Sequence, residues 1–222
     1  MRIGLLFAVL LLVDFQNAHS EGKGESAYPQ LAPIVENLGP GCRVRFDGPV
    51  RAARFSNLPG FDSDGKKNES WVNGSIGFVM RGLPHWDGDW SFGLSCYPSN
   101  DTKGIDGVAK YDLERKRWVI NSSVNEGIKD ANIKFLSVEA RNAQGWMFVH
   151  DDVAIDESKR CRHVQYCLYH GDRALCGETD VGCLKDIRRH TSADRTPYVK
   201  KMLSSVEFLL DAEPSGDVGD NR

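Results

Sequence analysis

The sequence predicts an α+β fold: a single domain over 21–210 in which a mainly antiparallel, twisted β-sheet carries a short helix near each end. Three observations lead to this prediction. Short segments with alternating apolar and polar residues follow one another through the middle of the chain, turn residues separate them, and the two helix-like patterns lie near the ends. The 222 residues include six cysteines, an even number, so we expect disulfide bonds to brace the sheet.

The first twenty residues have the pattern of a signal peptide. Arg2 precedes the apolar run Ile3–Val13, and Ala18 and Ser20 supply the small residues of a cleavage site. The apolar run is too short to span a bilayer, and no later segment is longer and as apolar. We therefore expect residues 1–20 to be removed on export, to the periplasm in a Gram-negative bacterium and otherwise to the medium, with no membrane span in the rest.

The first elements of the mature chain are predicted to be a helix and a strand pair. Pro29–Leu38 has apolar residues at helical spacing before Gly39-Pro40-Gly41, which predicts a short amphipathic helix. Arg43–Phe46 alternates and predicts a strand, with Val50–Phe55 as its partner. The turn-rich stretch Asn57–Asn73 predicts a long loop.

Antiparallel strands fill the middle of the chain, and a helix and a strand close it. The alternating segments are Ser75–Met80, Trp90–Cys96, Val108–Tyr111, Arg117–Ile120, Ile133–Val138 and Trp146–Val149. Near the end, Thr196 and Pro197 predict the N-cap and first turn of a helix. Its buried stripe comprises Tyr198, Val199, Met202 and Leu203. A strand over Val206–Leu210 follows, and the acidic tail 211–222 is expected to be disordered.

The segment Cys161–Cys183 contains four of the six cysteines and the clearest hairpin pattern in the sequence. Residues alternate in polarity over Val164–Leu168, and Gly171-Asp172 supplies the two central residues of a tight turn. If these two residues form the turn, Cys167 lies opposite Cys176 at a non-hydrogen-bonded site, where cross-strand side chains come closest. The spacing therefore predicts a Cys167–Cys176 disulfide.

The other two disulfides follow from the same register. Further from the turn, Cys161 lies almost opposite Gly182, one step from Cys183, and a bulge at Gly177 or Gly182 would absorb the mismatch. We therefore predict a Cys161–Cys183 disulfide. Cys42 and Cys96 then pair by elimination.

A zinc site is the alternative use of this hairpin. Cys161, His163, Cys167 and His170 are soft ligands at close spacing. A strand directs the first three to one face and His170 to the other, which opposes a shared tetrahedral site. We therefore expect disulfides, with no metal and no other cofactor.

The candidate binding loop consists of His85, Trp86, Asp87 and Asp89. This loop suits a calcium ion, a sugar-stacking platform formed by Trp86 and Trp90, or the acid–base pair of a hydrolytic enzyme. An EF-hand needs more oxygen ligands and a distal glutamate, which the loop lacks. A solvated turn with Trp90 in the core is the simpler interpretation, and we favour it.

Two further groups of polar residues are weaker candidates. His150-Asp151-Asp152 suggests a base with an orienting carboxylate, but adjacent strand residues point to opposite faces. The second group is a locally basic region, which we interpret as scattered solvated charges. It comprises Arg160, Arg162, His163, Lys185, Arg188, Arg189 and His190. The net charge of −3 and the acidic tail argue against a nucleic-acid partner.

Four Asn-x-Ser/Thr sequons occur, at Asn68, Asn73, Asn100 and Asn121. All of them fall in predicted loops or at strand ends, where a glycan has room. They are glycosylation sites only if the source is eukaryotic.

The C-terminal part of the chain resembles a group of bacterial exported proteins. The YCL…ALCG hairpin followed by TPYVKKMLSSVEFL is similar to the C-terminal part of uncharacterised exported proteins of proteobacteria, from about Gly145 onward. This resemblance implies a periplasmic location and transfers no catalytic residue. Some small exported proteins of this kind are immunity partners of secreted toxins.

The expected function is therefore binding rather than catalysis. The sequence contains no nucleophile elbow, metalloprotease helix, phosphate-binding loop or dinucleotide fingerprint. We expect a non-enzymatic cell-envelope protein that binds a protein partner, such as a toxin or an envelope protein. The alternatives are a hydrolytic enzyme with its site around His85, Asp87 and Asp89, and a ligand- or glycan-binding module.

Overall fold

The computed structural model describes residues 28–50, 52–57, 74–83, 85–86, 88–100, 102, 105–122, 124, 131–154 and 156–210. The expected signal peptide 1–20, the tail 211–222 and most of the loop Asn57–Asn73 lie outside these residues. The sequons at Asn68 and Asn73 and the candidate Asp87 also lie outside them.

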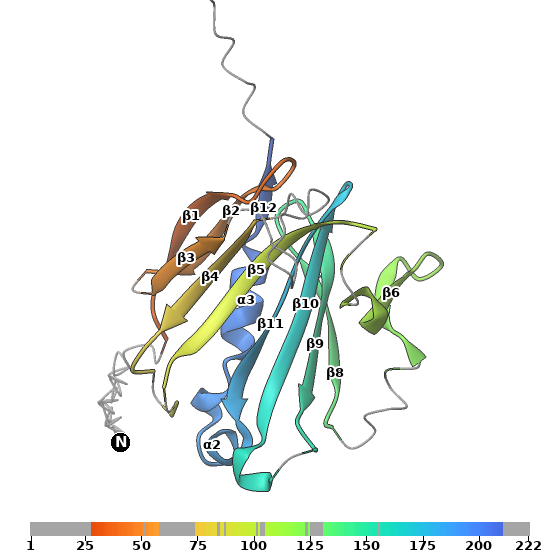
Figure 1. Cartoon of the computed structure of the whole chain (residues 1–222). Helices are drawn as coiled ribbons and strands as arrows, with labels where there is room; N and C mark the ends of the chain where they lie inside the picture. The colour runs from red at the N-terminus through yellow and green to blue at the C-terminus, as the bar shows by residue number, and fades with distance from the viewer. Residues whose placement is uncertain are drawn as a thin grey trace, which may run out of the picture.

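A seven-stranded antiparallel sheet forms the centre of the molecule (Figure 1). Its strand order is β3-β4-β5-β11-β10-β9-β8, and every neighbouring pair is antiparallel. The strands are β3 (Ala53–Asn57), β4 (Ser75–Met80), β5 (Trp90–Pro98), β8 (Lys134–Glu139), β9 (Gln144–Asp151), β10 (Cys161–His170) and β11 (Arg173–Cys183). The prediction of a mainly antiparallel, disulfide-braced sheet is therefore confirmed.

A three-stranded sheet, in the order β1-β2-β12, packs on one face of the large sheet. It contains β1 (Leu31–Asn37), β2 (Arg43–Pro49) and β12 (Glu207–Leu209). The predicted pairing of Arg43–Phe46 with Val50–Phe55 is wrong, because β2 pairs with β1 and β12 while β3 pairs with β4.

The predicted helix over Pro29–Leu38 is also wrong, because this segment forms the edge strand β1. A helix would have buried Ile34 and Val35 together. In the strand they point to opposite faces, so Ile34 packs against the core while Val35 is 48% exposed. Pro33 removes a backbone donor, which an edge strand tolerates and a helix interior does not.

Two α-helices are described over their full length, α2 (Leu184–Arg189) and α3 (Thr196–Ser204), with short 3₁₀ turns η1 (Ile105–Val108), η2 (Glu157–Lys159) and η3 (Thr191–Ala193). The predicted α3 stripe is confirmed, since Tyr198, Val199, Met202 and Leu203 are buried. The N-cap is Arg195 rather than the predicted Thr196. Asp194 takes the capping role, because its carboxylate accepts a hydrogen bond from the Thr196 backbone N–H at 3.0 Å.

The main core lies between the large sheet, α3 and the small sheet. In Figure 1, α3 crosses behind the large sheet, and β1, β2 and β12 lie at the top of the view. The predicted strand faces are confirmed, because the alternating apolar residues of β4 and β5 are buried. These residues are Ile76, Phe78, Met80, Trp90, Phe92, Leu94 and Cys96.

A smaller hairpin covers part of the opposite face of the large sheet. It consists of β6 (Ala109–Asp112) and β7 (Arg117–Ile120), as the sequence predicts, and it protrudes at the side of the sheet (Figure 1). Between the hairpin and the sheet lies a second apolar cluster that includes Trp146 and the Cys167–Cys176 disulfide. We call the face of the large sheet that this hairpin covers the outer face.

The predicted hairpin register and all three disulfides are confirmed. Cys167 lies opposite Cys176 with 4.1 Å between their Cα atoms, and Cys161 lies opposite Cys183. The register shifts between Arg162 and His163, and Gly182, with a φ of 153°, lies at this bulge. Cys42–Cys96 joins the segment before β2 to β5 and so connects the two sheets.

Candidate functional site

The structure does not gather the candidate loop residues into one site. The His85 ring stacks on His190 at 4.1 Å, Trp86 lies over the Arg195 guanidinium, and Asp89 pairs with Arg81 at 3.2 Å. Trp90 is only 1% exposed, so its ring has no face left for a sugar. The described part of this loop is a turn on a buried tryptophan, which is the interpretation that the sequence favoured.

Arg195 is buried in an aromatic enclosure at the start of α3. Its guanidinium lies 4.9 Å from the ring centre of Trp86 and 6.0 Å from that of Trp90, and Nη1 donates to the Ala193 carbonyl at 3.2 Å. Burial lowers the pKa of Arg195. These contacts are those of a residue that stabilises the fold, because the side chain is only 1% exposed.

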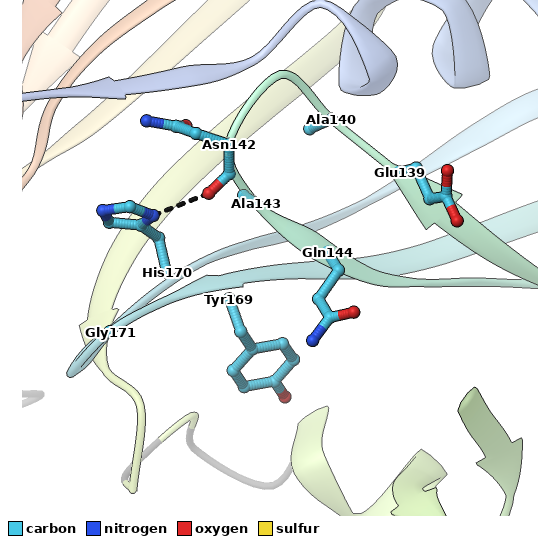
Figure 2. Close-up of a pocket in the computed structure, with 8 residues that line it drawn as sticks. All are labelled: Glu139, Ala140, Asn142, Ala143, Gln144, Tyr169, His170 and Gly171. Atoms are coloured by element: carbon cyan, nitrogen blue, oxygen red, sulfur yellow. Dashed lines mark hydrogen bonds between the residues drawn. The ribbon is translucent and has the colours of Figure 1, made fainter. Parts of the chain in front are cut away.

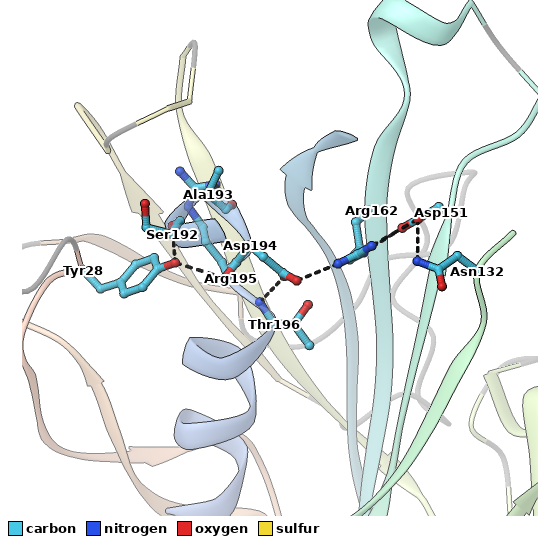
Figure 3. A network of polar contacts seen from close by, with 9 residues as sticks. All are labelled: Tyr28, Asn132, Asp151, Arg162, Ser192, Ala193, Asp194, Arg195 and Thr196. Carbon is cyan, nitrogen blue, oxygen red and sulfur yellow. Dashed lines mark hydrogen bonds and ion pairs between the residues drawn. The ribbon is translucent and has the colours of Figure 1, made fainter. Parts of the chain in front are cut away.

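Arg162 forms a network that connects β9, β10 and the α3 cap (Figure 3). Its guanidinium binds both carboxylate oxygens of Asp151, at 2.7 and 3.1 Å, and Asp194 at 2.6 Å. Asn132 donates to Asp151 at 2.9 Å. Burial alone would raise the pKa of Asp151, but the hydrogen bonds from Arg162 and Asn132 and the charge of Arg162 hold it below its usual value. The hydrogen bond to Asp151 raises the pKa of Arg162.

His150 and Asp151 point to opposite faces, as expected, because Asp151 binds Arg162 while His150 lies beside His163 on the outer face. The two rings are 5.3 Å apart, His163 Nδ1 donates to Asp180, and His163 Nε2 is 3.9 Å from Asp152. The hydrogen bond to Asp180 raises the pKa of His163, whereas burial and the charge of His163 lower the pKa of His150. One ring therefore keeps its proton to a higher pH than the other.

The β6–β7 hairpin is attached to the outer face by aromatic rings. Trp118 of β7 stacks on Tyr169 of β10 with ring centres 4.5 Å apart, and its edge meets Tyr111 of β6 at 5.4 Å. At the base, the Asn121 side chain donates to the Gly107 carbonyl at 2.7 Å. These contacts fix the hairpin relative to the sheet, so its tip is presented in one orientation.

The tip of this hairpin, residues 113–116, combines a fixed turn with an exposed leucine. Asp112 Oδ1 accepts hydrogen bonds from the backbone N–H groups of Glu114 and Arg115, both at 3.0 Å. The bond from Arg115 is the main cause that lowers the pKa of Asp112. Lys116 has a φ of 49°, which closes the turn. Leu113 stands on this turn and is 80% exposed. We call residues 113–116 the Leu113 tip.

An open hollow of about 480 Å³ lies between the β8–β9 turn and the β10–β11 turn (Figure 2). Its lining comprises Glu139, Ala140, Asn142, Ala143, Gln144, Tyr169, His170 and Gly171. Tyr169 is also the residue on which Trp118 stacks, so the hollow adjoins the β6–β7 hairpin. We call it the turn hollow.

All six cysteines are in disulfides, which removes the thiolates that the alternative zinc site needed. Within the described part of the chain, no three His, Cys, Asp or Glu side chains surround a common metal position. Among those same segments, no helix is long and apolar enough to cross a membrane. The remaining sequons lie at the surface, with Asn100 exposed in the turn after β5 and Asn121 bonded to Gly107.

No protein-family model matches this chain, and no curated protein matches it either.

Three features were not among the predictions from the sequence: the pairing of His163 with Asp180, the burial of Arg162, and the turn hollow. Asp180 was detectable as the partner of His163, since counting outward from Gly171-Asp172 places them opposite each other. Arg162 was assigned to a solvated basic region, yet it is only 8% exposed. The turn hollow had no signal, because its lining comes from two turns that only the sheet brings together.

Proposed function

We propose that this protein is a non-enzymatic exported binding protein that inhibits or sequesters a partner protein by inserting the Leu113 tip into it. The observation that carries the proposal is the exposure of Leu113 at the end of a protruding hairpin whose turn is already fixed by Asp112. Single exposed apolar residues are common on protein surfaces. Leu113 differs from them because hydrogen bonds to Asp112 hold its turn and the Trp118–Tyr169 stack holds its hairpin.

That support lowers the entropic cost of binding. A flexible loop must be ordered when it binds, whereas the Leu113 tip is held by its turn and by the Trp118–Tyr169 stack. A rigid hairpin with one apolar residue at its end fits a pocket of leucine size. This is the geometry of an inhibitor that blocks a concave site.

The charges around the tip favour an acidic rim on the partner. Lys110, Arg115, Lys116 and Arg117 are exposed, against one exposed carboxylate at Glu114. Complementary charges steer association and select the partner more than they add affinity. The proposed partner is therefore a protein with an apolar pocket surrounded by Asp and Glu, as a toxin bound by an immunity protein could provide.

Export belongs to the same proposal. Three disulfides persist in an oxidising compartment such as the periplasm, and the signal-peptide pattern and the resemblance to exported proteobacterial proteins support that location. The enzyme alternative is less well supported, since His85, Trp86 and Asp89 contact three different partners.

Affinity capture with matched variants tests this proposal. The mature protein would be used as bait in the envelope fraction of the producing organism, beside Leu113→Asp and the control Val153→Asp. Val153 is also exposed, at 41%, but lies in the loop after β9. We expect wild type and Val153→Asp to retain one stoichiometric partner, and Leu113→Asp to lose it by at least about tenfold, since a buried anchor contributes about 2 kcal/mol or more.

Two results would count against this function. Equal capture by Leu113→Asp would place the interface elsewhere. Absence of any stoichiometric partner for the wild type would remove the binding function itself. Thermal unfolding of the three proteins serves as the folding control, because both substituted positions are exposed and should leave stability unchanged.

A further inference from the structure

We propose that the turn hollow binds a cationic alkyl group that ends in a guanidinium or an ammonium. The ligand is either a free small cation or the side chain of an arginine or lysine of a bound protein. Tyr169, which lines the hollow (Figure 2), also stacks on Trp118 of the β6–β7 hairpin, but the chemistry of the hollow is separate from that of the Leu113 tip.

The walls of the hollow are fixed before any ligand arrives. Asn142 donates to the Phe208 carbonyl at 2.7 Å and accepts from the Phe208 N–H at 2.8 Å, which holds the β8–β9 turn against β12. His170 Nδ1 donates to the Asn142 carbonyl at 2.7 Å, and its ring stacks on Phe208 at 5.1 Å. A preformed site spends little of its binding free energy on ordering.

The lining offers hydrogen-bond acceptors. Gln144 adds an amide oxygen and Glu139 a carboxylate. Glu139 lies opposite Gln144, and Gln144 opposite Tyr169, so these three side chains share one face at the ends of three neighbouring strands.

The described lining of the hollow contains one carboxylate, that of Glu139, and no lysine or arginine to neutralise it. Glu139 is exposed, and among the described residues no lysine or arginine lines the hollow. Arg141 is the positively charged residue nearest to Glu139 in the sequence, but it pairs with Glu207 at 3.3 Å. An acceptor-rich lining with one unpaired carboxylate favours a donor-rich cation, and the planar fork of a guanidinium matches a carboxylate with two hydrogen bonds.

The size of the hollow favours an alkyl cation over a bare ion. About 480 Å³ lies within the range of small-molecule sites, which is roughly 300–1,000 Å³, and far exceeds the volume of a single ion. Ala140, Ala143 and the Tyr169 ring supply apolar surface for a chain of methylene groups. The site therefore suits a charged end group on a short alkyl stem.

Nuclear magnetic resonance titration of the mature protein tests the site without any partner protein. The probes are agmatine, N-acetyl-arginine amide and N-acetyl-citrulline amide, the last being an uncharged analogue of nearly the same shape. We expect the two cations to shift the backbone amides of Gln144 and Gly171 in a saturable way, and the citrulline probe to leave them unchanged. Binding of both cations indicates that free cations are ligands; binding of the arginine amide alone indicates a protein side chain.

The matched variants are Glu139→Gln in the hollow and Glu114→Gln at the Leu113 tip. We expect Glu139→Gln to weaken cation binding about tenfold, because a hydrogen bond to a charged group is lost, and Glu114→Gln to leave it unchanged. Citrulline binding equal to arginine binding, no saturable shift with either cation, or full binding by Glu139→Gln would each overturn the proposal. Both glutamates are exposed, and an unchanged amide spectrum confirms folding.

The outcome is independent of the proposed function. Failure of cation binding leaves the capture experiment with Leu113→Asp unaffected. Failure of that capture in turn leaves the titration of the turn hollow valid.

Discussion

At the level of single residues, Arg162 shows how a charged side chain becomes part of the core. Its position on β10 directs it to the side of Val164 and Tyr166, where water cannot compensate its charge. Asp151 and Asp194 compensate it instead, and Asp194 also caps α3. One guanidinium therefore connects the sheet to the helix.

Removal of the Arg162 guanidinium should lower the free energy of unfolding strongly, whereas removal of an exposed guanidinium should lower it only slightly. We expect Arg162→Met to lower the free energy of unfolding by about 3–5 kcal/mol, because two partly buried carboxylates lose their counterion. The control Arg188→Met breaks the exposed pair with Glu157 and should cost less than about 1 kcal/mol. Urea denaturation followed by tryptophan fluorescence measures both values. Similar costs for the two variants would contradict the role of Arg162.

The same comparison has a pH dependence with a definite sign. In the wild type the pKa of Asp151 is lowered, so its contribution to stability is present above its unfolded pKa and is lost as the pH falls through the folded pKa. In Arg162→Met the buried Asp151 lacks its cation, and acid relieves the penalty by protonating it. The difference between wild type and variant should therefore shrink as the pH falls from 7 toward 4.

At the level of secondary-structure elements, the predictions succeeded where the deciding contacts are local. The β10–β11 register follows from a two-residue turn and a period of two, and these two features also located the disulfides. The helix prediction over Pro29–Leu38 is wrong because the apolar spacing of this segment fits both a helix and a strand, and only Pro33, which a helix interior disfavours, indicates the strand. The Arg162–Asp194 pair was not predictable, since its partners come from distant segments that only the fold brings together.

Strand β12 depends on a side chain from another element. It is three residues long, and Asn142 makes two hydrogen bonds with the backbone of Phe208. Asn142→Ala should lower the free energy of unfolding by about 1–3 kcal/mol and accelerate hydrogen exchange at the Phe208 amide. Gln144→Ala, at an exposed position two residues away, is the control and should change neither quantity. Unchanged exchange at Phe208 in Asn142→Ala would show that Asn142 does not hold the strand.

At the level of the whole molecule, the disulfides differ in what they connect. Cys42–Cys96 spans 54 positions and joins the two sheets, whereas Cys167–Cys176 spans 9 positions within one hairpin. All four residues are fully buried, so their replacement by alanine creates comparable cavities. The two pairs therefore allow a clean comparison of loop length.

The longer loop should contribute more to stability. The chain-entropy model gives about 4.2 kcal/mol for Cys42–Cys96 and about 2.7 kcal/mol for Cys167–Cys176. We expect the double alanine variant at 42 and 96 to unfold at a lower urea concentration than the one at 167 and 176, with a free-energy difference of about 1.5 kcal/mol. Equal midpoints, or the opposite order, would show that loop entropy does not dominate here.

None of the three disulfide-closed segments contains the β6–β7 hairpin. It lies between Cys96 and Cys161, and its four tip residues bury no apolar side chain. Substitutions at 113–116 should therefore change the free energy of unfolding little, although each one alters the shape or the charge of the tip. The framework and the proposed binding tip are therefore separate parts of the molecule. If the tip binds a partner as proposed, natural selection can exchange one specificity for another without rebuilding the fold.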